Sequence, residues 1–253
     1  MQTIAIVNRK GGVGKTATVQ ALGAGLRREG YRILFIDLDS QHNLTHGTGA
    51  SANGLNSMDV LTGRKTALET IQHTGQGDII AGSEALAGAD AIIDGTGKEY
   101  RLKEALEEIG GVYDFAVIDT PTALGTLTVN ALTAAKTAVV PVQPDIYSLQ
   151  GFSQLNEAIR AVKKYCNHNL TISGILITRF SARSILSRDM RENFEELAIK
   201  TGTRVFSVPI RECVKIREAQ TLQQDIFEYA PRSNAAKDYA AFVREFLELQ
   251  KNQ

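Results

Sequence analysis

The segment NRKGGVGKTA at residues 8–17 has the residue types and spacing that most directly indicate chemistry. Its three glycines allow backbone conformations that other residues rarely adopt, so several N–H groups can point at one anion. Lys15 can reach the β- and γ-phosphates of a nucleotide, and the hydroxyl of Thr16 can bind Mg²⁺. We therefore predict a phosphate-binding loop whose contacts come from Gly11, Gly12, Val13, Gly14, Lys15, Thr16 and Ala17.

The loop departs from the common pattern G-x-x-x-x-G-K-[ST], which places a glycine at position 9. The sequence has Arg9 there, and a second cation, Lys10, follows it. Because the glycines that shape the loop are present, the departure does not exclude phosphate binding. It raises the question of what the two cations do.

Carboxylates end two apolar segments elsewhere in the chain. ILFIDLDS contains Asp37 and Asp39, and FAVIDTP contains Asp119. An unpaired carboxylate at the end of a buried strand is costly, so each should face a cation or a hydrogen-bond donor. Asp119 is similar to the carboxylate that nucleotide hydrolases place at Mg²⁺, directly or through water.

These side chains require a sheet to position them. Apolar, β-branched segments alternate with segments of helical periodicity, which is typical of a parallel sheet with crossover helices. The expected fold is α/β, a doubly wound, mostly parallel sheet flanked by helices on both faces, as in P-loop NTPases. The expected strands are TIAIV, RILFID, GDIIAG, DFAVIDT, TAVVPV, TISGILIT and TRVFSVP.

Length and composition favour one soluble globular domain over residues 1–253. The formal net charge is zero, and residues 179–217 carry nine Lys and Arg against five Asp and Glu. No apolar run approaches the length of a membrane span and no leader precedes the first strand, so we expect a cytoplasmic protein. The two cysteines, Cys166 and Cys213, lie too far apart in sequence to suggest a zinc site.

The motifs KGGVGKT, DLDSQHNLT, DTPTALGTLTVNAL and VVPVQPDIYSLQGFSQL occur in an order that resembles the ParA/Soj partition ATPases, a deviant Walker A group that includes MinD. The resemblance covers nearly the whole chain and implies an ATPase that forms a homodimer on binding ATP and Mg²⁺. In that family the residue matching Lys10 reaches the phosphates of the partner subunit and acts in trans. Arg9 matches a variable position and should be solvated.

The resemblance also separates the roles of the two aspartates after the second strand. Asp39 matches the residue that positions the attacking water, which makes Lys10, Lys15 and Asp39 the expected catalytic residues. Asp37 matches the residue that supports the metal region, so the expected metal residues are Thr16, Asp37 and Asp119. The family usually has proline after the second aspartate, where this sequence has Ser40, and a proline would stiffen the turn.

Members of the family bind DNA non-specifically as ATP dimers and are reset when a ParB-like, centromere-binding partner stimulates slow hydrolysis. The resemblance therefore implies DNA partition, with the ATP-bound protein on the nucleoid. Contacts with DNA phosphate need mainly charge. The expected DNA-binding residues are Arg179, Arg183, Arg211, Lys215 and Arg217, and the expected adenine contacts come from loops near Thr178 and Pro209.

Other readings of the sequence remain. Only nine residues precede Lys10, so we expect no N-terminal helix-turn-helix extension.

A MinD-like positioning ATPase would need a basic amphipathic C-terminus, but residues 235–250 are acidic and are expected to pack on the sheet. An iron-sulfur carrier would need paired cysteines. A scaffold that holds ATP without cleaving it, for a cargo other than DNA, is harder to exclude because of Ser40.

Overall fold

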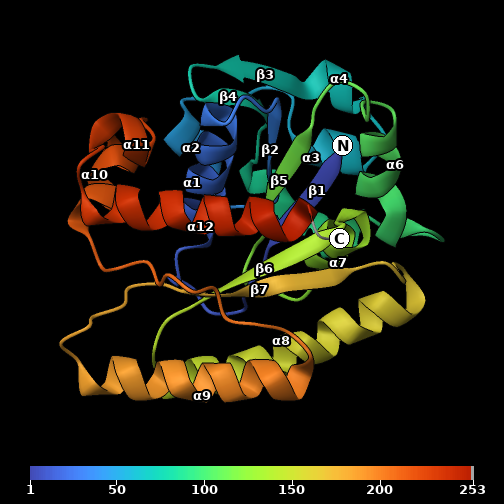
Figure 1. Cartoon of the computed structure of the whole chain (residues 1–253). Helices are drawn as coiled ribbons and strands as arrows, with labels where there is room; N and C mark the ends of the chain where they lie inside the picture. Colours follow the sequence, from blue (N-terminus) through green and yellow to red (C-terminus); the bar gives the residue numbers. More distant parts are fainter. Residues whose placement is uncertain (252–253) are drawn as a thin grey trace.

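The structure is a computed structural model that describes residues 1–251 and is built around one seven-stranded sheet (Figure 1). The strand order is β3-β4-β2-β5-β1-β6-β7, and every neighbouring pair is parallel except β3 and β4. This confirms the predicted α/β fold. The strands are β1 (Gln2–Ile6), β2 (Ile33–Asp37), β3 (Ile71–Thr74), β4 (Gly77–Ile80), β5 (Phe115–Asp119), β6 (Thr137–Val142) and β7 (Thr171–Ile177).

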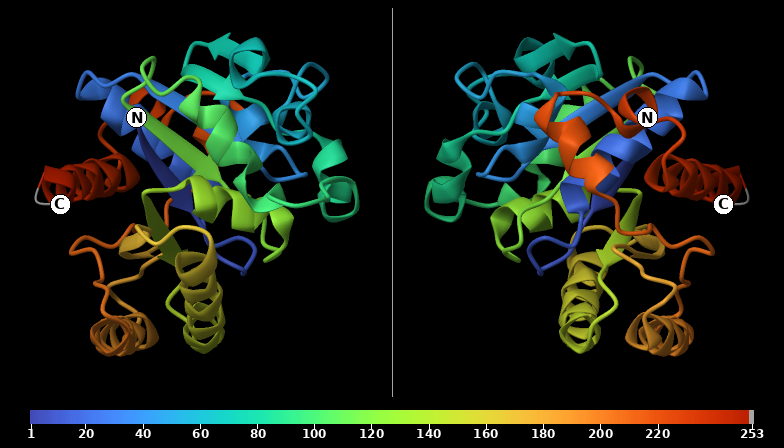
Figure 2. Two further views of the ribbon diagram at one scale, coloured as in Figure 1. Left: turned by 90° about the vertical axis from the view of Figure 1, so that its right-hand side faces the viewer. Right: turned by 90° about the vertical axis from the view of Figure 1, so that its left-hand side faces the viewer.

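Helices cover both faces of the sheet, and Figure 2 shows α8 and α9 side by side, away from α12. Buried side chains of α6 to α9 belong to one apolar cluster, and those of α1 and α10 to α12 belong to the other. The helices are α1 (Lys15–Arg28), α2 (Asn43–Thr48), α3 (Ser57–Leu61), α4 (Ala67–Thr70), α5 (Ala89–Ile92), α6 (Arg101–Glu107), α7 (Thr126–Ala134), α8 (Ile146–Tyr165), α9 (Ile185–Thr201), α10 (Val214–Thr221), α11 (Ile226–Tyr229) and α12 (Asn234–Lys251), with 3₁₀ turns at Glu84–Gly88 and Lys98–Tyr100.

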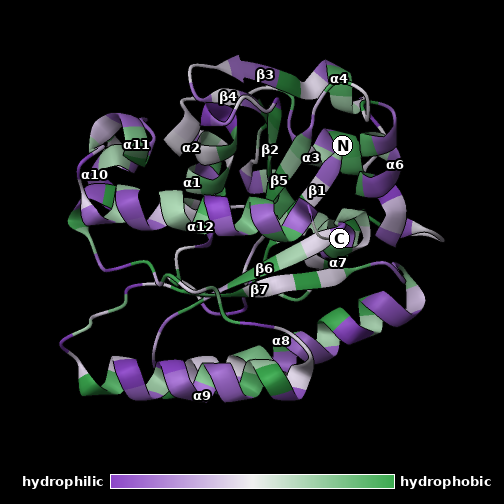
Figure 3. Ribbon diagram, in the orientation of Figure 1, coloured by the Kyte–Doolittle hydropathy of each residue, from purple (hydrophilic) through white to green (hydrophobic). Residues whose placement is uncertain are grey.

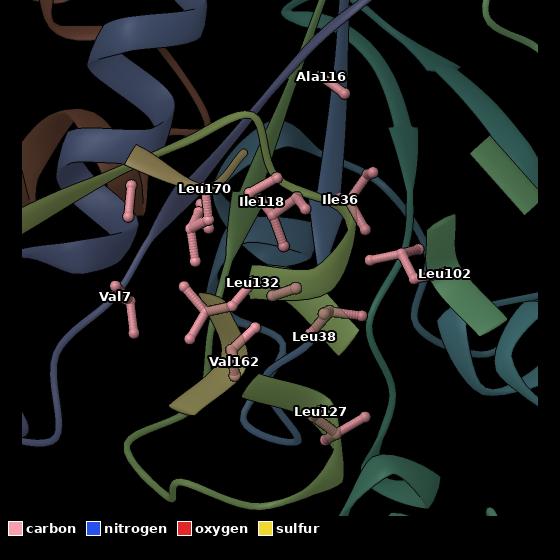
Figure 4. Close-up of a cluster of buried hydrophobic side chains, with 14 of the residues drawn as sticks. Val7, Ile36, Leu38, Leu102, Ala116, Ile118, Leu127, Leu132, Val162 and Leu170 are labelled. Carbon is pink, nitrogen blue, oxygen red and sulfur yellow. The ribbon is translucent and has the colours of Figure 1, made fainter. Parts of the chain in front are cut away.

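Burial of both faces of the sheet explains why the strand sequences are continuously apolar. Side chains of β2 and β5 such as Ile36 and Ile118 meet Leu132 of α7 within one cluster (Figure 4). Alternate residues of the same strands, such as Phe35 and Val117, join the cluster on the opposite face. The helices show mixed polar and apolar colouring in Figure 3, as expected for elements that bury one side only.

The central strands bring the predicted site residues to one edge. β5 lies between β2 and β1, with Asp37 in register with Asp119 and Asp119 in register with Ile6. Parallel strands end at the same edge, so the loop after β1 and both aspartates meet there. Ligands bind at this carboxyl edge in open α/β sheets.

Two local predictions were wrong. TRVFSVP forms no strand, because only Val205 makes an isolated bridge to β7 while the N–H of Ser207 donates to the Glu245 carboxylate at 2.9 Å. Strand β3 is not among the strands expected from the sequence. It is a four-residue, partly exposed antiparallel edge strand, and its polar sequence IQHT gives little pattern to detect.

Helix α12 packs on the sheet as expected. Its residues Tyr239, Phe242, Val243 and Phe246 are buried in the cluster that contains α1. Within residues 1–251, no helix has the length and apolar character needed to span a bilayer. The burial of its apolar side chains shows that this face of α12 is used for folding.

Candidate active site

The loop between β1 and α1 has the conformation of an anion-binding nest. Gly12 and Gly14 adopt positive φ values of 74° and 85°, a region that favours glycine. Helix α1 begins directly after Gly14, with no side-chain cap and no acidic residue in its first turn. The first N–H groups of the helix and the positive end of its dipole are therefore available to an anion such as phosphate.

Lys15 is buried beside this nest, with only 7% of its surface exposed. Burial lowers the pKa of Lys15, and the charges of Asp119 and Asp39 oppose this shift without cancelling it. The lysine Nζ donates to the carbonyl of Lys10 at 3.5 Å, a long hydrogen bond. A poorly solvated ammonium group at the nest is well placed to bind phosphate oxygens.

Thr16 and Asp119 form the metal end of the site. The hydroxyl of Thr16 donates to Oδ2 of Asp119 at 2.6 Å, and the buried Oδ1 of Asp119 has no partner within residues 1–251. Burial, followed by the charge of Asp37, raises the pKa of Asp119, so its ionised form needs a nearby cation. This donor set fits Mg²⁺, which uses few protein ligands together with phosphate and water oxygens.

Asp37 lies next to Asp119 but contacts no cation in residues 1–251. Its Oδ2 accepts from the N–H and the hydroxyl of Thr45 at 2.9 and 2.7 Å, and its Oδ1 accepts from the N–H of Asp39 at 3.0 Å. Burial raises the pKa of Asp37 although the Thr45 hydrogen bonds oppose this. The predicted role of Asp37 in supporting the metal region stays a prediction. In this structure its carboxylate accepts hydrogen bonds from its own segment of the chain.

Asp39 lies at the wall of a cavity of about 970 Å³. Its Oδ1 accepts from the N–H of Gln41 at 3.0 Å, so the carboxylate is used in a turn. The volume lies at the upper end of the range for ligand pockets and can hold a nucleoside triphosphate. Sequence-predicted residues that line this cavity are Gly11, Gly12, Gly14, Lys15, Thr16, Ala17, Asp39, Thr178, Arg179, Arg211 and Arg217.

The two residues named for adenine contacts differ in position. Thr178 lines the cavity, but its hydroxyl donates to the carbonyls of Val13 and Val142 at 2.8 and 3.0 Å. It therefore fixes the phosphate loop against β6. Pro209 is not among the lining residues, whereas the next residue, Ile210, is.

Lys10 does not extend away from its own chain. Its Nζ forms an ion pair of 2.5 Å with Asp145, the N-cap residue of α8. Partial burial raises the pKa of Asp145, but hydrogen bonds from Lys10 and from the N–H of Ser148 outweigh burial and lower it overall. Arg9 contacts the side chain of Gln154 on the exposed surface.

The cations predicted to bind DNA occupy different environments. Arg183 is exposed in the loop before α9. Lys215 is paired with Glu218 on the exposed side of α10 at 2.8 Å. Arg211 instead makes two side-chain hydrogen bonds of 2.9 and 2.6 Å to Asp238, whose side chain is only 6% exposed.

Sequence reasoning assigned no role to Thr45, Asp145 or Asp238. Thr45 and Asp145 lie within motifs that carried the family resemblance, DLDSQHNLT and VVPVQPDIYSLQGFSQL. Their polar partners are far away in sequence or depend on a turn that sequence does not specify. No local signal in the sequence identifies Asp238 as the partner of Arg211.

A parallel sheet whose first strand leads through a glycine nest into a helix, with Lys15, Thr16 and Asp119 at the nest, defines the class of P-loop nucleotide-binding proteins. Residues 1–172 match the family model described as an AAA domain. The sporulation initiation inhibitor protein Soj of Bacillus subtilis is 38% identical over 247 residues, which cover 96% of each chain. The chain belongs to the ParA/Soj family of ATPases.

Two further comparisons agree with this assignment. The chromosome partitioning protein ParA of Caulobacter vibrioides is 32% identical over 264 residues, covering 100% of this chain and 96% of the relative. The crystal structure of cobyrinic acid a,c-diamide synthase from Mycobacterium smegmatis, with bound ADP and magnesium, is 32% identical with a TM-score of 0.86 and covers 99% of this chain and 96% of that one. Relatives with different names thus share this fold.

Proposed function

We propose that this chain is a DNA partition ATPase whose ATP-bound homodimer binds DNA non-specifically and is released by hydrolysis. The observation that carries the proposal is the phosphate nest with the Thr16 and Asp119 pair beneath it and the signature residue Lys10 in the same loop. The name of the relative from Caulobacter vibrioides, chromosome partitioning protein ParA, supports partition as the biological role.

ATP binding follows from the groups around the nest. The N–H groups of Gly11 to Thr16 surround the β-phosphate, and Lys15 neutralises the β- and γ-phosphates. Thr16 and Asp119 would hold Mg²⁺, which would supply positive charge to the phosphate oxygens. The unpaired Oδ1 of Asp119 supports this assignment, because a buried carboxylate oxygen requires a partner.

Hydrolysis in this proposal uses a carboxylate beside the attacking water and cations beside the phosphates of ATP. Asp39 lines the cavity and would orient the water after leaving its hydrogen bond to the N–H of Gln41. Lys10 would exchange Asp145 for the phosphates bound to a second subunit. Both rearrangements have to precede turnover, so we expect slow basal hydrolysis that a ParB-like partner accelerates.

DNA binding is assigned to exposed cations outside the cavity. Arg183 is exposed, and the pair between Lys215 and Glu218 lies at the surface, where ion pairs stabilise a protein little, so Lys215 can exchange Glu218 for a DNA phosphate. Arg211 is assigned to structure because it pairs with buried Asp238. Two copies of a weak patch in one dimer bind DNA more tightly than one copy does. Because ATP forms the dimer, ATP binding would retain the cytoplasmic protein on the nucleoid.

Phosphate release and DNA retention test this proposal together. The parent protein, Asp39→Ala and the double variant Arg183→Glu with Lys215→Glu are assayed with Mg²⁺ and ATP or ADP, with and without non-specific duplex DNA, at several salt concentrations. We expect ATP-dependent DNA binding that weakens steeply with salt, loss of turnover in Asp39→Ala, and loss of DNA binding alone in the double variant.

Two results would contradict the proposal. DNA binding that is equal with ATP and ADP would remove the nucleotide switch. Turnover in Asp39→Ala that matches the parent, with the centromere-binding partner present, would favour an ATP-binding scaffold.

A further inference from the structure

Asp37 is fully buried, and its hydrogen bonds come from a short stretch of the chain. One oxygen accepts from the N–H of Asp39 and the other accepts from the N–H and hydroxyl of Thr45. No Lys, Arg or His side chain within residues 1–251 forms an ion pair with Asp37. Thr45 therefore fixes the carboxylate of Asp37, and this carboxylate in turn fixes the main chain of Asp39.

The hydroxyl of Thr45 has two functions in this arrangement. It donates to Oδ2 of Asp37 at 2.7 Å and accepts from the N–H of Gly82 at 2.8 Å. One buried hydroxyl thus connects the end of β2, helix α2 and the segment after β4. Serine could make both bonds, whereas valine, which has nearly the same shape, could make neither.

The main chain of Gly82 also supports the turn that contains Asp37 and Asp39. A Cβ atom at this position would lie 2.8 Å from Cγ of Asp37 and 3.0 Å from the carbonyl oxygen of Asp39. The first distance is shorter than Cβ contacts in proteins, and the second is tighter than most of them, so a side chain here would force the turn to shift. The main chain of Gly82 therefore lies directly against the turn, and the Thr45 hydroxyl fixes it there.

This support matters because the turn contains Ser40 and no proline. Inside the turn, Asp39 accepts from the N–H of Gln41 with its side chain and from the N–H of His42 with its carbonyl, at 3.0 and 2.9 Å. The side-chain bond is the one that Asp39 would give up to orient a water molecule. The main chain of Asp39 then keeps the hydrogen bond from the N–H of His42 and the contacts from Asp37 and Gly82.

We infer that Thr45 is a positioning residue for hydrolysis: its hydroxyl fixes Asp37 and Gly82, and these hold the main chain from which Asp39 reaches the attacking water. The inference rests on the proposed function, in which Asp39 acts on that water. It assigns Thr45 no contact with ATP. Loss of the hydroxyl should therefore affect turnover much more than nucleotide binding.

The test compares Thr45→Val, Thr45→Ser and Thr48→Val. Thr48 is a matched control because it is also buried in α2, but its hydroxyl donates only to the carbonyls of Leu44 and Thr45. For Thr45→Val we expect kcat to fall at least about tenfold while the Kd for Mg²⁺ and ATP stays within about threefold of the parent. Thr45→Ser and Thr48→Val should keep parental turnover.

Amide hydrogen exchange tests the positioning without catalysis. The N–H groups of Asp39 and Gly82 donate into this arrangement, so both should exchange about tenfold faster or more in Thr45→Val and remain protected in Thr45→Ser and Thr48→Val. The melting temperature of each variant is recorded to show that it is folded.

Each negative result has a distinct meaning. Unchanged turnover in Thr45→Val, an equal loss in Thr48→Val, or unchanged protection of the Asp39 amide would each overturn the role of Thr45. A parent protein that releases no phosphate contradicts the proposed function instead. In that case the exchange of the two amides still decides whether Thr45 holds the turn.

Discussion

Lys10 and Asp145 form an ion pair of 2.5 Å within one chain, between the phosphate loop and the first turn of α8. Both side chains are partly buried, 35% and 27% exposed, and Asp145 also accepts from the N–H of Ser148 as the cap of its helix. A lysine that acts in trans must leave this carboxylate. The pair therefore opposes the dimer that we propose.

Replacing Asp145 by asparagine should favour ATP-dependent dimerisation. Asparagine retains a good helix cap and removes the charge that holds Lys10. A partly exposed pair is worth roughly 1 kcal/mol, and the homodimer breaks two such pairs, one in each subunit, which corresponds to about a thirtyfold tighter dimer. Sedimentation analysis with Mg²⁺ and ATP measures the change. Lys10→Ala serves as the control and should not dimerise, and an unchanged dimer constant in Asp145→Asn would show that the pair does not oppose assembly.

Alanine substitutions of Arg211 and Arg183 should differ in their effect on the free energy of unfolding, because Arg211 is assigned to structure and Arg183 to DNA binding. Arg211→Ala removes the main partner of a buried carboxylate, and because Arg211 itself is 43% exposed, we expect a loss of about 2 kcal/mol in the free energy of unfolding. Arg183→Ala changes an exposed loop residue and should shift this free energy by less than about 0.5 kcal/mol. Urea unfolding measures both, and equal stabilities would contradict the assignment.

The cysteines provide a chemical probe of the cavity. Cys213 lines it and Cys166 does not, although both cysteine residues are partly exposed. Mg²⁺ and ATP should slow alkylation of Cys213 at least about fivefold, because a bound nucleotide excludes reagent from the cavity, and should leave Cys166 unchanged. Mass spectrometry of the labelled peptides measures each site separately. Equal protection of both cysteines would indicate a general change in the protein and not occupancy of the cavity.

The nest was predictable from sequence because its chemistry is local. Gly12, Gly14, Lys15 and Thr16 lie within five consecutive residues, and the strand before them and the helix that begins at Lys15 fix their geometry. Asp119 was predictable for a related reason: it ends an apolar strand, and parallel strands end at one edge. These inferences required only the alternation of strands and helices.

The partners of the charged residues could not be predicted in this way. Lys10 and Asp145 are 135 positions apart, and Arg211 and Asp238 are 27 apart. Whether a cation is free or paired depends on how helices pack, and the sequence pattern shows only that it is charged. Arg211 therefore resembled a DNA contact until its carboxylate partner was visible.

Glycines of two helices should respond oppositely to alanine. A Cβ at Gly23 of α1 would lie 2.1 Å from the ring of Phe35, which is fully buried in β2, so Gly23→Ala should destabilise the protein by about 1–3 kcal/mol. A Cβ at Gly151 of α8 meets nothing within 4 Å, so Gly151→Ala should stabilise it by up to about 1 kcal/mol through helix propensity. Thermal unfolding measures both. A stabilised Gly23→Ala would mean that Phe35 can move.

Tyr239 should make stability depend on alkaline pH. Burial raises its pKa to about 12, with the nearby Thr18 hydroxyl opposing the shift and the charge of Asp238 adding to it. In the unfolded chain the pKa is about 10, so between about pH 10 and 12 the unfolded state releases a proton that the folded state keeps. Stability is complete below pH 10 and falls as pH rises, by about 2–3 kcal/mol for this residue. Tyr239→Phe should remove that part of the loss, the exposed Tyr147→Phe should retain it, and urea unfolding at pH 9 and pH 11.5 distinguishes the two. The same loss of stability in Tyr239→Phe and in the parent would assign the alkaline dependence to other groups.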